Sequence, residues 1–250
     1  MKRPKLELLE PRDVERIIGE AYELLWDPGV RIHSDEALTL LGDAGAQVDK
    51  EKKVAHIPAD LIQKALDTAP SSFYLYNTDG EPVVHYGDDD VQFDPGSAAI
   101  YIIDHGATAS RKPVTQDFVR YIKLAEGLPA LDAVSTAMIC ADVPEGMADL
   151  YRLYLVLRYA RKPVITGAFD VNTWYTMYNL LVAVAGSAEA LREKPIAVFD
   201  ACPSPPLLWS EITCQNLIDC ARTGVPAELV SMPLTGATGP ATLVGAVVQH

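Results

Sequence analysis

A strand-and-helix pattern repeats about every 30 residues over the second half of this chain. Strand-like segments have their centres near residues 137, 165, 198 and 230. A helical pattern follows each strand, over 150–160, 172–191 with an interruption near 186, 210–221 and 239–250. Because consecutive parallel strands need a crossover of about this length, the repeat predicts βα units and a parallel sheet. The spacing is typical of a (β/α) barrel, of which four units out of eight are present.

The last unit of this pattern is incomplete. Gly239-Pro240 is typical of a helix start, because proline suits the first helical position. No stop signal follows before His250, so we expect a barrel cut inside its fourth helix, with roughly another hundred or more residues beyond it. A doubly wound sheet is the alternative architecture, but its G-x-G-x-x-G turn is missing between the first strand and its helix.

The region before the repeat has two other patterns. Residues 1–70 carry apolar residues at helical spacing, and Ser34 and Pro58 are typical of helix starts. The strand-like segments FYLY, VVHY and AAIYIID follow within 71–113, separated by turn-forming residues. Thr115 is expected to cap the next helix. The predicted fold is α/β: a helical and antiparallel β cap region over 1–114, then the first half of a TIM-like barrel over 115–250.

Composition narrows the class of protein. Hydrophobic residues make up 49% of the chain, and a chain of 250 residues is long enough to bury a substantial core. The N-terminal thirty residues contain no uninterrupted apolar stretch, and no apolar run is long enough to cross a membrane. Four cysteines in a chain of this length are typical of reduced cytoplasmic thiols. A net charge of −13 disfavours nucleic acid and would mildly steer a cationic substrate or a basic partner to the surface, although simple solubility is the better explanation of the charge alone.

Four segments resemble a known family. GVRIHSDEALTLLGDAGAQVD, IPADLIQKALDTAPSSFYLY, AVAGSAEALREKP and MPLTGATGPATLVGAVVQ are similar, in this order, to the N-terminal half of trimethylamine:corrinoid methyltransferases (the MttB family). The last of them, a strand ending in Met-Pro before a Gly-Ala-Thr loop and an apolar helix, is the most specific. The resemblance implies a TIM-like barrel that moves a methyl group from a methylated amine to the cobalt of a separate corrinoid protein. It also implies methanogenic or methylotrophic metabolism.

The resemblance leaves the substrate open between two amine classes. Trimethylamine-specific members carry an active-site pyrrolysine in the half that lies beyond residue 250, whereas relatives without it act on quaternary amines such as glycine betaine. The catalytic residues are therefore expected beyond residue 250. Since a quaternary ammonium already carries a neutral leaving group, the protein needs only to bind it, orient it and exclude water. We favour a quaternary amine, because aromatic faces and carboxylates suit a permanent cation.

Substrate-binding candidates lie where the predicted barrel strands end, since that face carries the chemistry in this architecture. Phe169 and Trp209 are candidates for walls around a cation, and Asp142 or Asp200 for its counter-charge. Gly236 and Thr238, in the loop TGATG, are candidates for binding an anion such as a betaine carboxylate or a corrinoid phosphate through backbone amides.

Each candidate has a structural alternative. Asp142 and Asp170 are equally typical of helix caps, whereas CPSPPLL separates Asp200 from the expected cap at Ser210. Trp209 is equally typical of a residue that plugs the barrel rim. The TGATG loop is slightly more typical of a tight βα turn than of an anion site. The aromatic residues near the start of the second barrel helix, Trp174, Tyr175 and Tyr178, are expected to pack in the core.

Metal chemistry has little support in the sequence. Cys140 and Cys202 follow neighbouring strands and are conceivable zinc ligands, but the histidines lack ligand spacing, so no metal site is expected. The main functional hypothesis is a cytoplasmic, homo-oligomeric, corrinoid-dependent methyltransferase. A zinc-dependent barrel methyltransferase and a non-catalytic betaine-binding protein are the alternatives.

Overall fold

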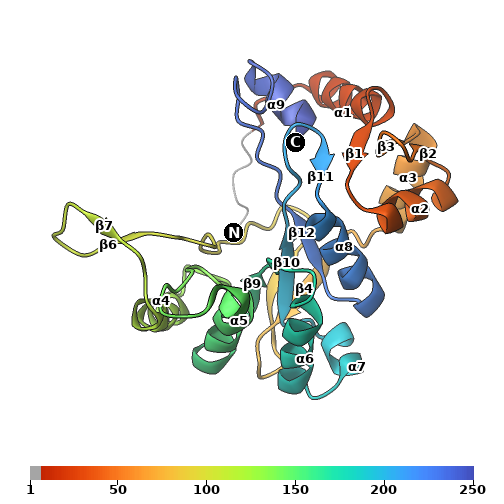
Figure 1. Cartoon of the computed structure of the whole chain (residues 1–250). Helices are drawn as coiled ribbons and strands as arrows, with labels where there is room; N and C mark the ends of the chain where they lie inside the picture. Colours follow the sequence, from red (N-terminus) through yellow and green to blue (C-terminus); the bar gives the residue numbers. More distant parts are fainter. Residues whose placement is uncertain (1–6) are drawn as a thin grey trace. The chain divides into compact units, whose positions relative to one another are not determined.

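The computed structural model describes residues 7–250 and divides into two compact units (Figure 1). Among the described residues, the first unit contains 7–69, Cys202–Cys214 and Val230–His250, and the second contains Pro70–Ala201 and Gln215–Leu229. The predicted division at residues 114 and 115 stays a prediction. The compact units divide the chain elsewhere, because residues 70–114 belong to the same unit as the parallel sheet.

The second unit is built on a four-stranded parallel sheet. Its strands are β8 (Val134–Ser135), β9 (Val164–Thr166), β10 (Ala197–Ala201) and β12 (Ala227–Leu229), in the order β12-β10-β9-β8. These four strands are thus neighbours in the order in which they follow one another along the chain, and all three pairs are parallel. The predicted four parallel strands and mixed α/β class are confirmed.

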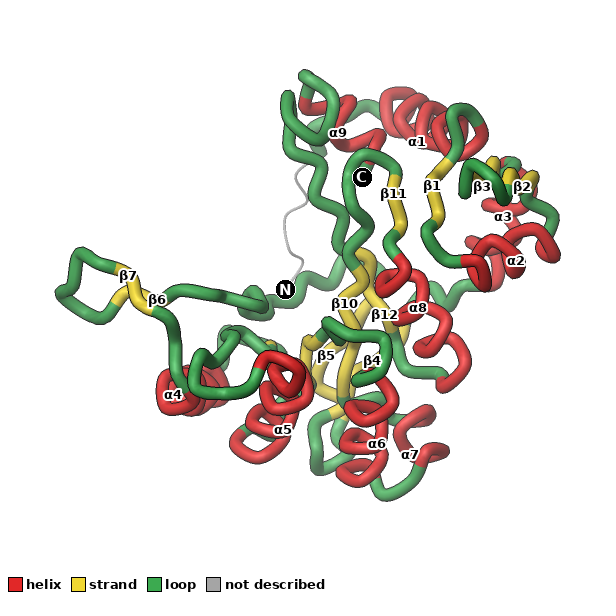
Figure 2. Tube along the Cα trace, viewed as in Figure 1, coloured by secondary structure: helices red, strands yellow, loops and turns green. Residues whose placement is uncertain are grey.

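Helices follow β8, β9 and β10, as the sequence predicts (Figure 2). They are α5 (Ala148–Tyr159) after a short 3-10 turn η1 (Glu145–Met147), α6 (Trp174–Ala185) with α7 (Ala188–Glu193), and α8 (Glu211–Thr223). The predicted interruption lies between α6 and α7, where Gly186 has a φ of 93° and the Ser187 hydroxyl accepts from the amide of Ala190 at 3.1 Å. The helix before the sheet is α4 (Thr115–Gly127).

Two side-chain clusters bury the two faces of the sheet. On one face, Phe199 packs with Trp174 and the helices, and both side chains are fully buried. On the other, Val198 packs against Leu75 and Val84, which belong to the antiparallel hairpin of β4 (Phe73–Tyr76) and β5 (Pro82–Tyr86). The predicted strands FYLY and VVHY are confirmed, and AAIYIID forms only the two-residue strand β6 (Ile102–Ile103), paired with β7 (Ser110–Arg111).

The first unit differs from the predicted all-helical front end. It contains α1 (Pro11–Trp26), α2 (Asp35–Ala44) and α3 (Ala59–Thr68), but also β1 (Val30–Ile32), β2 (Gln47–Asp49) and β3 (Val54–His56). These strands form a sheet in the order β11-β1-β3-β2, with β11 (Leu208–Trp209) joining in parallel. The Ser34 hydroxyl caps α2 by accepting from the amide of Ala37 at 3.2 Å, as predicted. Strands of three residues are too short to show an alternating pattern in the sequence, so the prediction missed them.

Two predicted helix starts are wrong. Helix α9 (Leu243–Gln249) begins after Thr242, whose hydroxyl accepts from the amide of Gly245, because residues 234–240 form a turn instead. Thr115 is the first residue of α4 and not its cap. The capping group is the Asp117 carboxylate, which accepts from the backbone amide of Val114 at 3.0 Å. Within the described residues, no helix has the length and apolar character needed to cross a membrane.

Asp117 also anchors a charged cluster at this helix start, which leads to a stability prediction. Arg111 donates to both of its carboxylate oxygens, at 2.7 and 3.0 Å, and this arginine holds the pKa of Asp117 well below its usual range. Since the lowered pKa favours the folded state above about pH 4, Asp117→Asn should cost about 1–3 kcal/mol at pH 7. Urea unfolding at several pH values should show this difference shrinking as the pH falls below 4. A stability difference between the two proteins that stays the same at every pH would contradict the assignment of this stabilisation to the charge of Asp117.

Candidate functional site

Two carboxyl side chains face each other near the carboxyl ends of the parallel strands. Asp200 of β10 and Glu228 of β12 are paired in register, so their side chains leave the sheet on the same face. This is the face of Val198, which packs against the β4–β5 hairpin, because Val198 and Asp200 are two residues apart. The pair therefore lies on the face of the sheet that the β4–β5 hairpin covers, opposite the face that the helices cover.

The surroundings of this pair are acidic and partly dry. One Asp200 oxygen, Oδ2, accepts from the hydroxyl of Ser97 at 3.4 Å, whereas Oδ1 is buried without a hydrogen-bond partner among the described residues. Burial, followed by the charge of Glu228 and then of Asp94, raises the pKa of Asp200. Burial and the charge of Asp94 raise the pKa of Glu228 as well. An arrangement of this kind gains stability either by holding a proton or by binding a cation.

Tyr86 completes this acidic surface from strand β5. Burial, followed by the charges of Glu228, Asp94 and Asp200, raises the pKa of its hydroxyl to about 12. Its ring stacks on Phe73 with 5.1 Å between ring centroids. The phenol is thus neutral and the site presents carboxylates together with an aromatic ring, which is the combination that binds organic ammonium ions. We name Tyr86, Asp94, Ser97, Asp200 and Glu228 the acidic site.

Gly167 lies close to Asp200. A Cβ atom at this position would lie 3.4 Å from the carbonyl oxygen of Asp200 and 3.7 Å from its Cβ. Gly167 follows strand β9 directly, so the small residue leaves the space beside the Asp200 side chain unoccupied by a side chain of β9.

The other predicted residues of the second unit hold the ends of helices and strands. The Asp142 carboxylate accepts from the amide of Thr115 at 2.9 Å, at the start of α4, and Asp170 accepts from the amide of Asn172. The Phe169 ring lies against a cation of the chain itself, with its centroid 4.3 Å from Cζ of Arg152. Asp200 is therefore the predicted residue of this unit that belongs to the acidic site.

Arg152 contacts the backbone just after strand β8. Its side chain is buried, and its Nη1 donates to the carbonyl oxygen of Thr136 at 2.6 Å. Nε has no hydrogen-bond partner within the described residues, and burial lowers the pKa of the guanidinium to about 10. Asp149, also buried, accepts from the amide of Phe169 at 2.9 Å. These contacts order the loop after β9, next to the acidic site.

Three predicted site residues belong to the first unit. Trp209 pairs with Ile32 across parallel strands and packs against the core of that unit. The amide of Gly236 donates to the carbonyl of Pro240, and the amide of Thr238 donates to that of Leu234. The loop thus forms a tight turn that uses its own amides. Substrate contacts by Asp142, Phe169, Trp209, Gly236 and Thr238 stay predictions.

The cysteine side chains do not form a metal site with other described residues. Within residues 7–250, no group of three or more His, Cys, Asp or Glu side chains is arranged to hold a metal ion. Cys140 is buried in the second unit, whereas Cys202 is exposed in the first. Burial raises the pKa of the Cys140 thiol to about 11, so this side chain is a protonated core residue.

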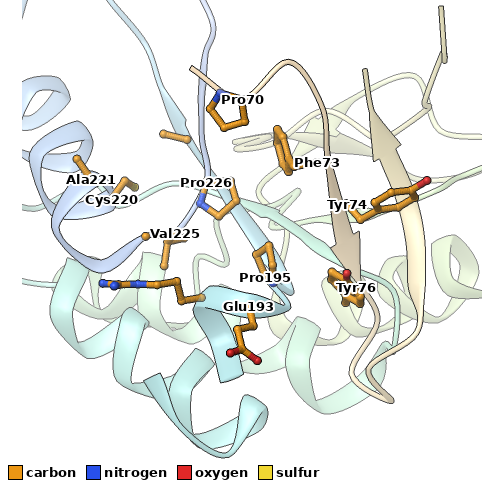
Figure 3. Close-up of a pocket in the computed structure, with 13 residues that line it drawn as sticks. Pro70, Phe73, Tyr74, Tyr76, Glu193, Pro195, Cys220, Ala221, Val225 and Pro226 are labelled. Carbon is orange, nitrogen blue, oxygen red and sulfur yellow. The ribbon is translucent and has the colours of Figure 1, made fainter. Parts of the chain in front are cut away.

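The second unit also contains a cavity of about 470 Å³, and its lining residues Phe73 and Ala227 adjoin Tyr86 and Glu228 of the acidic site. It is lined at the amino ends of β10 and β12 by Pro195 and Pro226, and by Phe73, Tyr74 and Tyr76 of β4 (Figure 3). Arg192, which also lines it, donates to the carbonyl of Thr223. Because chemistry in parallel α/β folds lies at the carboxyl ends of strands, we do not assign the substrate to this cavity.

Comparison with known proteins decides the family. The model of the family described as trimethylamine methyltransferase (MTTB) matches residues 1–250. The chain belongs to the trimethylamine methyltransferase (MTTB) family. The resemblance identified from the sequence is therefore confirmed.

Curated relatives carry two functional names. Trimethylamine methyltransferase MttB of Desulfitobacterium hafniense is 29% identical over 91% of this chain and 46% of its own length. The protein of the same name from Methanosarcina thermophila is 29% identical over 98% of this chain and 52% of its own. A glycine betaine methyltransferase of D. hafniense is 26% identical over 97% of this chain and 50% of its own length. The chain thus spans about half the length of the curated relatives it matches.

A solved structure supports the fold. The fold is similar to a chain in the crystal structure of the hydroxylamine MtmB complex, with a TM-score of 0.51 and 13% sequence identity. The similarity covers 95% of this chain and 55% of that one.

Sequence reasoning missed most of the acidic site of this MTTB-family chain. Glu228 carried a signal, because it is a charged residue inside the apolar strand segment PAELV. Asp94 and Ser97 come from the turn-rich segment after β5, which predicts no position in space. Only tertiary structure brings this segment along the edge of β8, where the amide of Asp132 donates to the carbonyl of Phe93 at 2.8 Å.

The raised pKa of Asp200 gives a prediction for stability. Because the folded state holds this proton more tightly than the unfolded chain, folding stability should fall as the pH rises from about 4 through the raised pKa. Asp200→Asn removes the buried charge, so we expect the variant to be about 1–3 kcal/mol more stable than the natural chain at pH 8 and equally stable at pH 4. Urea unfolding at both pH values measures this. If the variant and the natural chain were equally stable at pH 8, the charged Asp200 would not be destabilised by burial and by Glu228.

Proposed function

We propose that this protein is a corrinoid-dependent methyltransferase that takes a methyl group from a methylated, preferentially quaternary, amine such as glycine betaine. The observation that carries the proposal is the acidic site, where two facing carboxyl groups and a neutral tyrosine lie near the carboxyl ends of parallel strands. The names of the MTTB-family relatives support methyl transfer from amines. The proposed place of action is the cytoplasm.

The residues of the acidic site suit binding and orientation of an ammonium ion. Asp200 and Glu228 repel one another when both are charged, and an ammonium between them relieves this repulsion. Their charge attracts the whole ammonium group, and the Tyr86 ring contacts its N-methyl groups. A quaternary amine suits this site because its nitrogen needs no proton before it can leave. When the bond between the methyl carbon and the nitrogen breaks, the nitrogen keeps the electron pair and becomes a neutral amine. The acceptor is Co(I) of a separate corrinoid protein, which supplies the nucleophilic electron pair.

We further propose that the four parallel strands are the first half of a (β/α)8 barrel. Their neighbour order follows the sequence, as in a barrel. The relatives are about twice as long as this chain. On this proposal the second half of the barrel pairs with the edge of β12 and supplies the catalytic residues that determine the choice between trimethylamine and a quaternary amine.

The decisive experiment uses the protein made from its native gene, whose intact mass and peptide map are determined first. The purified protein is mixed with its cognate corrinoid protein in the Co(I) state, and the absorption spectrum is followed after adding glycine betaine or trimethylamine. Methylation with glycine betaine supports the proposal. Methylation with trimethylamine alone would correct the substrate, and tight binding of betaine without any transfer would identify a binding protein instead.

A further inference from the structure

Gly167 lies in the same row of the parallel sheet as the carboxyl pair. Strands β9 and β10 lie side by side, and Ile165 is opposite Val198 in their register (Figure 1). The same register, continued by two residues, brings Gly167 beside Asp200, which is itself opposite Glu228. Ile165 belongs to the cluster under the β4–β5 hairpin, so position 167 faces the same side of the sheet as the acidic site.

A side chain at position 167 would contact Asp200. A Cβ atom there would lie 3.7 Å from Cβ of Asp200 and 3.4 Å from its carbonyl oxygen, which are ordinary van der Waals distances. Apart from the residues next to Gly167 in the chain, no other heavy atom of the described residues lies within 4 Å of this position. Because glycine has no side chain, room for a methyl group lies beside the side chain of Asp200.

The backbone that follows Gly167 is held in place. The carbonyl oxygen of Ala168 accepts from Nδ2 of Asn216 at 3.3 Å, and the amide of Phe169 donates to the Asp149 carboxylate at 2.9 Å. Asn216 and Asp149 are both buried. Moving the segment away from Asp200 would leave these buried polar groups without partners, which is costly. The distance between Gly167 and Asp200 is therefore fixed by the fold.

Backbone conformation gives no reason for a glycine at this position. Eight glycines of the described chain have a positive φ, which a residue with a side chain rarely adopts, and Gly167 is not one of them. An alanine could adopt the same backbone conformation, and its methyl group would fit without a clash. The property that distinguishes glycine here is the room that it leaves beside Asp200.

This room matches one N-methyl group of an ammonium ion. The Asp200 carboxylate attracts the ammonium group, so the N-methyl groups meet the surfaces that surround this carboxylate. The ring of Tyr86 is one such surface, and the backbone at Gly167 is another. We propose that Gly167 is a specificity-determining residue that admits a fully methylated ammonium ion beside Asp200. This inference rests on the proposed function, because it takes the acidic site as the amine site.

Isothermal titration calorimetry of the protein made from its native gene tests the proposal, with methylammonium, trimethylammonium and tetramethylammonium chlorides as ligands. Gly167→Ala should lower the affinity for tetramethylammonium at least about tenfold more than the affinity for methylammonium, because the added methyl group takes the place of one N-methyl group. Trimethylammonium should lie between the two. A purely structural role of Gly167 would change the three affinities by the same factor.

Gly127→Ala is the matched control. Gly127 is the last residue of α4 in the same unit, it has no positive φ, and nothing lies within 4 Å of the position of its Cβ atom. This variant should keep the affinity for each ion within about twofold of the natural protein, as is usual for exposed substitutions. Circular dichroism checks that both variants fold, and a Gly167→Ala variant that does not fold would show that no room for a methyl group exists.

Asp200→Asn in the same titrations separates two kinds of failure. If Asp200→Asn weakens binding but Gly167→Ala leaves the ratio of the affinities unchanged, the acidic site binds amines and Gly167 does not determine their size. If the natural protein binds none of the ions, or if Asp200→Asn binds them as the natural protein does, the proposed amine site is wrong and the role of Gly167 falls with it.

Discussion

Asp200→Asn, made in the protein of native length, should lower kcat/KM for methyl transfer from a quaternary amine by roughly 30- to 150-fold. The change removes a charge and keeps the size of the side chain. Since interactions with a charged group contribute about 2–3 kcal/mol when the group is partly buried, the loss corresponds to this range of rates. Progress of methylation of the Co(I) corrinoid protein measures it at several amine concentrations.

Variants of Glu228 and Asp79 test whether this loss is specific to the acidic pair. Glu228→Gln should cause a loss of similar size, and the double variant should lose less than the product of the two, because both carboxylates act on one ammonium ion. Asp79→Asn is the matched control: Asp79 is a half-exposed carboxylate of the same unit that pairs with Arg161 at 2.8 Å. It should keep its rate within about twofold of the natural protein. A normal rate for Asp200→Asn, together with the gain in stability expected at pH 8, would mean that the acidic pair serves another purpose.

Trp174→Ala should lower the free energy of unfolding by about 3–5 kcal/mol, the usual cost of removing a large aromatic side chain from a core. Trp174 is fully buried at the start of α6. Its ring lies 5.3 Å from that of Phe199 on strand β10 and 5.5 Å from that of Tyr178, between ring centroids. The substitution therefore leaves a cavity between the sheet and its covering helix.

Urea unfolding followed by circular dichroism measures this loss, and Tyr175 supplies the control. Tyr175 is the next residue of the helix, but it is 48% exposed, and its hydroxyl donates to Asp219 at 3.2 Å. Tyr175→Phe should cost no more than about 1 kcal/mol. If Trp174→Ala also cost no more than this, α6 would not be packed against β10 as described.

Much of the second unit could be predicted because its signals are local and repeated. A buried parallel strand is a short apolar run and its crossover helix has a 3.6-residue period, so segments such as PVITG and LYRLYLVLRYA predict β9 and α5. The break at Gly186-Ser187 was predictable for the same reason, since glycine and a capping serine act on adjacent residues.

The candidate site was less predictable. Of the predicted substrate residues, Asp200 lies in the acidic site, whereas Asp142 holds the start of α4 and Phe169 stacks on Arg152. All three lie at or soon after the end of a predicted strand, so the sequence pattern does not distinguish them. Which of them lies on the hairpin-covered face of the sheet depends on strand register and on neighbours far away in the chain.

The sequence by itself determined the family, the α/β class and the four parallel strands with their helices, because these depend on composition and on periodic patterns within single segments. Only the tertiary structure decided that Asp200 pairs with Glu228, that Asp94 and Ser97 join them, and that short strands link residues 30–56 with Leu208 and Trp209. Contacts between residues far apart in the sequence are fixed by packing and register, and no local pattern records them.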